Sequence, residues 1–196
     1  MSDFSKSYTR TMKNEGAYSA NPRDPGGETY MGISRIKWAS WPGWREIDNV
    51  KSEMIKIPNY GTSSYDVWVH HLNSLLAVQP KLQLLIQGFY REYFWKAIGD
   101  ITDQRIADEV FDKCVNCGNV AAFWLQRATG VGADGIIGSL TISTVNSLDP
   151  VTLLHDFNEL AKAHYDGIIS HDPTQAVFRK SWYSRLKNYD DTPFVA

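Results

Sequence analysis

The chain lacks the surplus of basic residues that nucleic-acid-binding proteins carry. Its 196 residues include 20 lysines and arginines against 22 aspartates and glutamates, a formal net charge of −2. Binding to a DNA or RNA backbone normally requires a strong positive excess, so we expect no nucleic-acid partner. Attraction to another anionic surface has to come from a local patch. Arg179, Lys180, Arg185 and Lys187 are the candidate, and the alternative is a solvated helix face.

Long apolar runs are also missing. No stretch approaches the roughly 18 consecutive apolar residues of a transmembrane helix, so we expect no stable membrane insertion. Residues 1–6, MSDFSK, contain no apolar core of the kind that a signal peptide needs. The sequence therefore predicts a protein that stays in the cytoplasm of the cell that makes it until something else releases it.

Cysteine is scarce, because Cys114 and Cys117 are the only two in the chain. Their spacing can mark a redox pair or half of a zinc site. A second pair for zinc is missing, and a redox motif of the thioredoxin type follows a strand, whereas these cysteines continue a helical pattern. We therefore predict that both pack in the interior. His164 and His171 lack the i, i+4 spacing of a zinc protease, so we expect neither a metal nor another cofactor.

The N-terminal residues predict a helix with one apolar face. Phe4, Tyr8 and Met12 recur at i, i+4 and i+8, the spacing of one side of a helix. Glu15 falls on the same side, at the negative C-terminal end of the helix dipole. Apolar surroundings and the dipole both favour the protonated carboxylic acid, the form that a general acid needs. The alternative is an ordinary glutamate at a frayed helix end.

A tight turn and a short β-ribbon follow that glutamate. Pro22 and Pro25 fix two φ angles and favour extended geometry in the residues before them. Gly26-Gly27 permits positive φ, and residues 29–34 alternate as in a short strand. A carboxylate in a dry place, followed by a rigid turn that bears a second carboxylate, suits the cleavage of a glycosidic bond.

The run EGAYSANPRDPGGETYMGIS, which starts at Glu15, resembles the signature of the glycoside hydrolase family 108 muramidases. These are phage endolysins and secretion-associated bacterial lysozymes. The family motif has a second glycine where Ala17 stands. The resemblance implies that Glu15 is the catalytic acid. A looser similarity to the lambdoid phage lysozymes implies that Asp24 activates a water or stabilises positive charge at the sugar. It also implies that Thr29 positions a water or hydrogen-bonds Glu15. For Asp24 the alternative is an aspartate that caps its own turn.

Two further segments extend the resemblance toward the C-terminus. Residues 111–118, FDKCVNCG, are similar to the family's Phe-Asp-x-Ala-Val-Asn-x-Gly, and residues 125–141 are similar to its predicted peptidoglycan-binding segment. For Asn116 of the first motif, the alternatives are binding sugar hydroxyls or satisfying backbone groups at a helix end, and Gly118 is predicted to end that helix. The residues that we expect to bind substrate are Tyr30, Tyr90, Asn116 and Gln126.

These patterns predict a mainly α protein, a lysozyme-like helical body with a small β-ribbon after the first helix. No linker rich in proline, serine or glycine divides the chain, so we expect one domain over residues 1–196. Within it, residues 1–100 form the catalytic part and residues 101–190 a helical C-terminal part. Residues 37–81 are expected to be an irregular insertion with a helix near 66–76, and this insertion is either a wall of the sugar groove or passive.

The resemblance implies an N-acetylmuramidase that cleaves the β-1,4 bond between N-acetylmuramic acid and N-acetylglucosamine in peptidoglycan glycan strands. The expected setting is a monomeric phage endolysin, held in the host cytoplasm until a holin releases it, that acts in the periplasm or cell wall. One alternative is a lytic transglycosylase, which forms a 1,6-anhydro product without water. The other is a non-catalytic module that binds the cell wall and has lost the acid.

Overall fold

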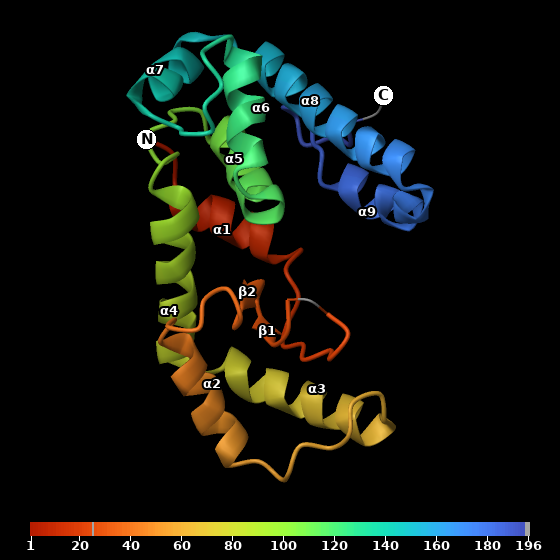
Figure 1. The fold of residues 1–196 in the computed structure, drawn as a ribbon. Coiled ribbons are helices and arrows are strands. Elements are labelled where there is room, and N and C mark those ends of the chain that lie inside the picture. The colour runs from red at the N-terminus through yellow and green to blue at the C-terminus, as the bar shows by residue number, and fades with distance from the viewer. Residues whose placement is uncertain (25, 195–196) are drawn as a thin grey trace. The chain divides into compact units, whose positions relative to one another are not determined.

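The computed structural model describes residues 1–24 and 26–194 and divides the chain into two compact units. We call Met12–Glu92 the hairpin unit. The helical unit comprises Met1–Thr11 and the chain from Tyr93 onward. Figure 1 shows the elements of each unit in the colours of the sequence. Pro25, which the sequence predicts to help form a turn, lies outside the described residues.

The elements confirm the predicted mainly α fold with a small β-ribbon. The hairpin unit contains β1 (Thr29–Tyr30), β2 (Ile33–Ser34), α2 (Gly43–Ser52), α3 (Ser63–Ala77) and α4 (Pro80–Tyr90). A π-helical turn, Arg91–Trp95, follows α4. The helical unit contains α1 (Phe4–Met12) through Thr11, α5 (Gln104–Cys117), α6 (Val120–Thr129), α7 (Ser139–Ser147), α8 (Pro150–His171), the 3₁₀ helix Pro173–Phe178 and α9 (Arg179–Ser184).

Helix α1 buries a different face from the one that the sequence predicted. Its buried residues are Phe4, Ser7 and Thr11, whereas Tyr8 and Met12 are only half-buried. Phe4 packs edge-on against Trp95, with ring centroids 5.7 Å apart. Ser7 is buried because its hydroxyl donates a hydrogen bond to the Asp108 carboxylate of α5. Hydrogen bonding to α5 therefore decides which face of α1 is buried, rather than the apolar spacing of Phe4, Tyr8 and Met12.

Helices α5, α6 and α8 form the core of the helical unit, where α6 packs against both of the others (Figure 1). The Asp103 side chain caps α5 by accepting the backbone N–H groups of Arg105 and Ile106 at 2.9 and 3.1 Å. Gly118, at φ 64°, ends the helix as the sequence predicted. Within the described parts of the chain, no helix is both long enough and apolar enough to cross a bilayer.

The two cysteines lie on α5 as free thiols. Burial raises the pKa of the Cys114 thiol to about 12, and Cys117 Sγ lies 3.4 Å from the Tyr165 hydroxyl oxygen. A thiol with a raised pKa stays protonated, and therefore unreactive, near neutral pH. Both side chains are half-buried, so interior packing of the two residues stays a prediction.

The expectation of an irregular stretch between residues 37 and 81 is wrong for much of its length. Helix α2 spans ten residues within it, buries Trp44 and Ile47, and packs against α3 and α4. The predicted helix at 66–76 is part of the longer α3, whose first turn is capped by the Thr62 hydroxyl. The sequence missed α2 because Pro42 and Gly43, which open the helix, also match the composition of a turn.

Candidate active site

Glu15 lies in a turn just beyond α1 rather than on the helix itself. The helix ends at Met12, and the Glu15 backbone N–H donates to the Met12 carbonyl oxygen at 3.3 Å. The residue is half-buried. The prediction that Glu15 continues the apolar face of the helix is therefore wrong, because the helix ends three residues earlier. The Glu15 side chain is positioned instead by the turn and by what lies opposite.

Opposite Glu15 is the tip of the β-hairpin. Tyr30 pairs with Ile33 across β1 and β2, and the two residues between them, Met31 and Gly32, have φ angles of 48° and 79°. Two positive φ angles define a two-residue turn of type I′, which matches the twist of a hairpin. The predicted strand over residues 29–34 is thus interrupted by this turn. Met31 is an uncommon residue for such backbone, and its carbonyl oxygen accepts a hydrogen bond from the Tyr90 hydroxyl.

The missing side chain of Gly32 leaves the space that Glu15 and Tyr90 occupy. A Cβ atom there would lie 2.7 Å from Glu15 Oε2 and 2.7 Å from the Tyr90 hydroxyl oxygen. Real Cβ atoms do not approach oxygen so closely. The Glu15 carboxylate and the Tyr90 hydroxyl therefore both lie in the space that a side chain at position 32 would occupy. Tyr90 is only 2% exposed, and its ring is therefore a fixed wall beside the acid.

Replacing Gly32 with alanine is expected to damage activity more than stability. The positive φ costs a non-glycine residue about 1–2 kcal/mol, while displacement of the Glu15 carboxylate lowers the rate on the order of 100-fold. Lysis of purified sacculi and the thermal midpoint measure the two effects. Gly130→Ala is the matched control, because Gly130 has φ 75° and nothing within 4 Å of an added Cβ. Equal losses of activity in the two variants would assign the effect to backbone strain alone.

Asp24 is exposed and is engaged by its own turn. Its Oδ1 accepts the Gly26 backbone N–H at 2.7 Å, and its carbonyl oxygen accepts that of Gly27 at 2.9 Å. Gly27 has φ 64°, the positive value that the sequence allowed for. These bonds are those of the turn-capping alternative, and a catalytic role for Asp24 stays a prediction.

The other predicted residues of the hairpin unit lie on β1. Thr29 is half-buried, and its backbone pairs with Ser19 through hydrogen bonds of 2.9 and 2.8 Å. Tyr30 is 3% exposed, and burial raises its pKa. The structure thus brings Glu15 and Tyr90 together, whereas the buried ring of Tyr30 faces the interior of the unit.

Asn116 and Gln126 belong to the helical unit and have intramolecular partners. Gln126 is 2% exposed. Its Nε2 donates to Asp134 Oδ1 at 2.7 Å, and its Oε1 accepts the Gly135 backbone N–H at 2.8 Å. Asn116 is exposed, and its Nδ2 donates to the Asp112 carbonyl oxygen at 3.4 Å. Gln126 therefore holds the Asp134-Gly135 turn, and binding of substrate by either amide stays a prediction.

A cluster of charges surrounds Glu28 and was not predicted from the sequence. The carboxylate accepts the Tyr18 hydroxyl at 2.8 Å and pairs with Lys51 Nζ at 2.8 Å and with Arg35 Nε at 2.9 Å. Burial, followed by the hydrogen bond to Glu28, raises the pKa of Tyr18. This cluster fixes the start of β1 against α2. The partner Lys51 could not be assigned from the sequence, since α2, on which Lys51 lies, was missed.

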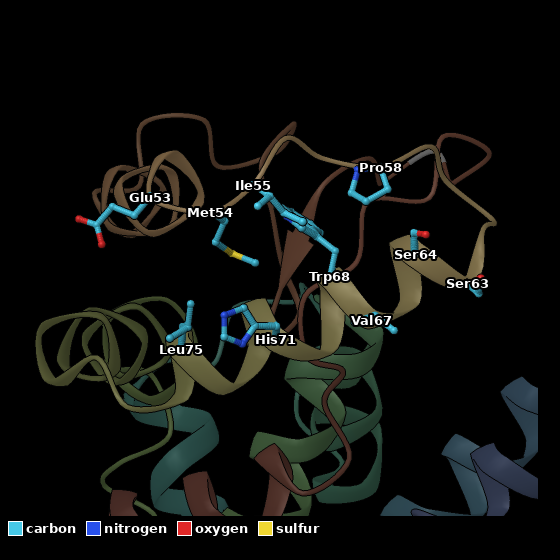
Figure 2. Close-up of a pocket in the computed structure, with 10 residues that line it drawn as sticks. All are labelled: Glu53, Met54, Ile55, Pro58, Ser63, Ser64, Val67, Trp68, His71 and Leu75. Atoms are coloured by element: carbon cyan, nitrogen blue, oxygen red, sulfur yellow. The ribbon is translucent and has the colours of Figure 1, made fainter.

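A large cavity of about 710 Å³ lies elsewhere in the hairpin unit (Figure 2). Met54 and Ile55 face Trp68, His71 and Leu75 of α3 across it. None of the predicted catalytic residues lines this cavity. Its walls are mainly apolar, and it is the gap between the 53–58 segment and α3 rather than the place of the acid.

An acid beside a hairpin, in a mainly α lysozyme-like fold, defines a class of enzymes that cleave glycans. The glycosyl hydrolase 108 family matches residues 8–118, which is more than half of the chain, and a predicted peptidoglycan domain matches residues 120–187. The chain belongs to the glycosyl hydrolase 108 family. It is a glycoside hydrolase whose partner is peptidoglycan. The family match runs through residues 37–81, which the sequence resemblance had left uncovered.

A solved structure of another protein has a similar fold. The structure of SagA from Brucella abortus is similar to this chain, with a TM-score of 0.61 and 24% sequence identity over 93% of this chain and 88% of that chain. At that identity, the similarity concerns the fold alone. No curated protein matches the chain.

Proposed function

We propose that this protein is an N-acetylmuramidase that hydrolyses the β-1,4 bond between N-acetylmuramic acid and N-acetylglucosamine, with Glu15 as general acid. The observation that carries the proposal is the Glu15 carboxylate held over Gly32 beside Tyr90, inside the segment that matches the family. In this mechanism Glu15 protonates the leaving glycosidic oxygen while the sugar develops oxocarbenium character. Thr29 and Asp24 lie on the ribbon and turn that follow, where they position the water.

We also propose that the reaction inverts the anomeric centre. A retaining enzyme needs a second carboxylate that attacks the sugar. Asp24 Oδ1 is already bonded to the Gly26 N–H at 2.7 Å in an exposed turn, which supports water rather than Asp24 as the nucleophile.

The products test the cleaved bond and the chemistry together. Purified sacculi are digested, the new reducing ends are reduced with borohydride, and the fragments are weighed by mass spectrometry. We expect reduced muramic acid at the new ends. Reduced glucosamine would assign the enzyme to the other glycosidic bond. A 1,6-anhydro end, which borohydride does not reduce and which is therefore lighter than the reduced end by one water and two hydrogens, would make it a transglycosylase. Intact sacculi would leave only a module that binds the wall.

We place this activity in a phage endolysin that reaches the wall through a holin and acts as a monomer. The proposal rests on the phage endolysins among the members of the glycosyl hydrolase 108 family. Expression in a bacterial host with and without a co-expressed holin tests it, since we expect lysis only when the holin is present. Lysis without a holin would indicate another route of release. Sedimentation of the purified protein measures its oligomeric state.

A further inference from the structure

We propose that a second, smaller cavity in the hairpin unit is a subsite for an uncharged sugar ring of the glycan, remote from the cleaved bond. The inference rests on the proposed glycan hydrolase function. The cavity has a volume of about 390 Å³, within the range of small-molecule sites. It lies between the Ser19-Ala20 backbone and α3, with Tyr60 and Gly61 at one end.

The cavity offers a rigid aromatic surface. The Tyr60 side chain is 48% exposed, and its ring is held edge-on against Tyr65, with centroids 5.0 Å apart and planes at 62°. Tyr65 is itself only 7% exposed, so the pair is anchored to α3. A half-exposed ring that is already ordered can stack against the apolar face of a sugar at little cost in conformational entropy.

Polar groups line the same cavity. Asp66 and His70 are one turn apart on α3 and therefore share a face. Asn73 Oδ1 accepts the Tyr18 backbone N–H at 2.9 Å, which leaves the amide nitrogen as the donor for a ligand. A carboxylate, an imidazole and an amide match the hydroxyl and N-acetyl groups of a sugar.

The charge of the lining favours a sugar over a stem peptide. No lysine or arginine is among the described residues that line this cavity, and Asp66 is their one carboxylate. The carboxylates of a stem peptide would face Asp66 without a fixed cation to pair with. An uncharged N-acetylhexosamine avoids that repulsion, because its hydroxyl groups donate to the carboxylate.

The position of the cavity connects it to the acid. Ser19 lines the cavity and pairs with Thr29 of β1. It is four residues from Glu15, so the two α-carbons are at most about 14 Å apart. A glycan that passes Glu15 and the ribbon therefore reaches the cavity within a few sugar units. Tyr60, Asp66 and His70 all come from residues 37–81, which gives that segment a role in substrate length preference.

Oligosaccharide binding tests the subsite in a Glu15→Gln background, where the substrate is not consumed. The probes are chitohexaose and chitobiose, and calorimetry measures affinity. We expect Tyr60→Ala to weaken chitohexaose binding about three- to tenfold, the strength of one aromatic contact, and to leave chitobiose binding unchanged. Tyr60→Phe keeps the ring and should bind normally. Val67→Ala is the matched control on α3, since Val67 lines the larger cavity.

Two outcomes overturn the subsite. One is chitohexaose binding by Tyr60→Ala that equals its parent, and the other is an equal loss for both oligosaccharides. Failure of the proposed function has a different signature, because the parent would then leave sacculi intact or Glu15→Gln would still lyse them. If the parent lyses sacculi, Glu15→Gln does not, and the Tyr60→Ala derivative of Glu15→Gln binds chitohexaose normally, the subsite alone is refuted.

Discussion

Changing Glu15 to glutamine is expected to lower the rate of sacculus lysis by about 10²–10⁴-fold, the usual contribution of a general acid. Glutamine has nearly the same shape as glutamate, but its amide cannot deliver a proton to the leaving oxygen. The residue is half-buried beside Gly32 and Tyr90, so the fold should tolerate the change. Turbidity of a sacculus suspension measures lysis, and circular dichroism shows whether the thermal midpoint is kept.

The companion variant is Asp24→Asn, since it neutralises the carboxylate that the proposed mechanism assigns to positioning the water. Asparagine retains an oxygen that can accept the Gly26 N–H, as Asp24 Oδ1 does at 2.7 Å. Activity close to that of the parent would show that Asp24 only shapes the turn. A loss as large as that of Glu15→Gln would give Asp24 a share of the chemistry. Unchanged lysis by Glu15→Gln would contradict the assignment of the acid.

The kind of fold was predictable because it is recorded locally in the sequence. The signature after Glu15 specifies a turn and a ribbon through its prolines and glycines, and the C-terminal helices follow periodic apolar residues. Gly118 ends α5 where predicted. These features depend on neighbours a few residues apart, which is the range over which propensity and periodicity act.

The details of the site depend on partners far apart in the chain, and the sequence did not reveal them. Tyr90 reaches the Met31 carbonyl across 59 positions and stabilises a turn whose positive φ at Met31 no residue preference predicts. Glu28 meets Lys51 only because α2 forms. Gln126 lies in the C-terminal motif and was predicted to bind substrate, yet its side-chain amide hydrogen bonds to the Asp134-Gly135 turn.

Asp112, the aspartate of the Phe-Asp motif on α5, lies in a buried network of charges. Lys113 is fully buried, and its Nζ donates to Asp112 at 2.9 Å, to Glu109 at 3.3 Å and to the Arg185 carbonyl oxygen at 2.7 Å. Arg185 returns two hydrogen bonds to Asp112, at 3.2 and 2.9 Å. Asp112 therefore ties α5 to the C-terminal stretch of the helical unit.

Asp112→Ala is expected to lower the free energy of unfolding by about 3–5 kcal/mol, because it leaves Lys113 and Arg185 buried without their shared counter-charge. Chemical denaturation at neutral pH measures the loss. Asp156→Ala is the control, since Asp156 is half exposed and, among the described residues, forms its ion pair with the neighbouring His155 at 3.3 Å. Removing that surface pair should change stability by less than about 1 kcal/mol.

The acid dependence of stability gives an independent test of the same network. Burial alone would raise the pKa of Asp112, but Lys113 and Arg185 outweigh it and hold that pKa below its usual value. A carboxyl group whose pKa is lowered by folding stabilises the protein above its unfolded pKa, about 3.9, and loses that contribution as the pH falls through the folded pKa. The difference in stability between the parent and Asp112→Ala should therefore shrink below about pH 4. A difference that stays constant into acid would mean that lost packing, rather than an unpaired charge, destabilises the variant.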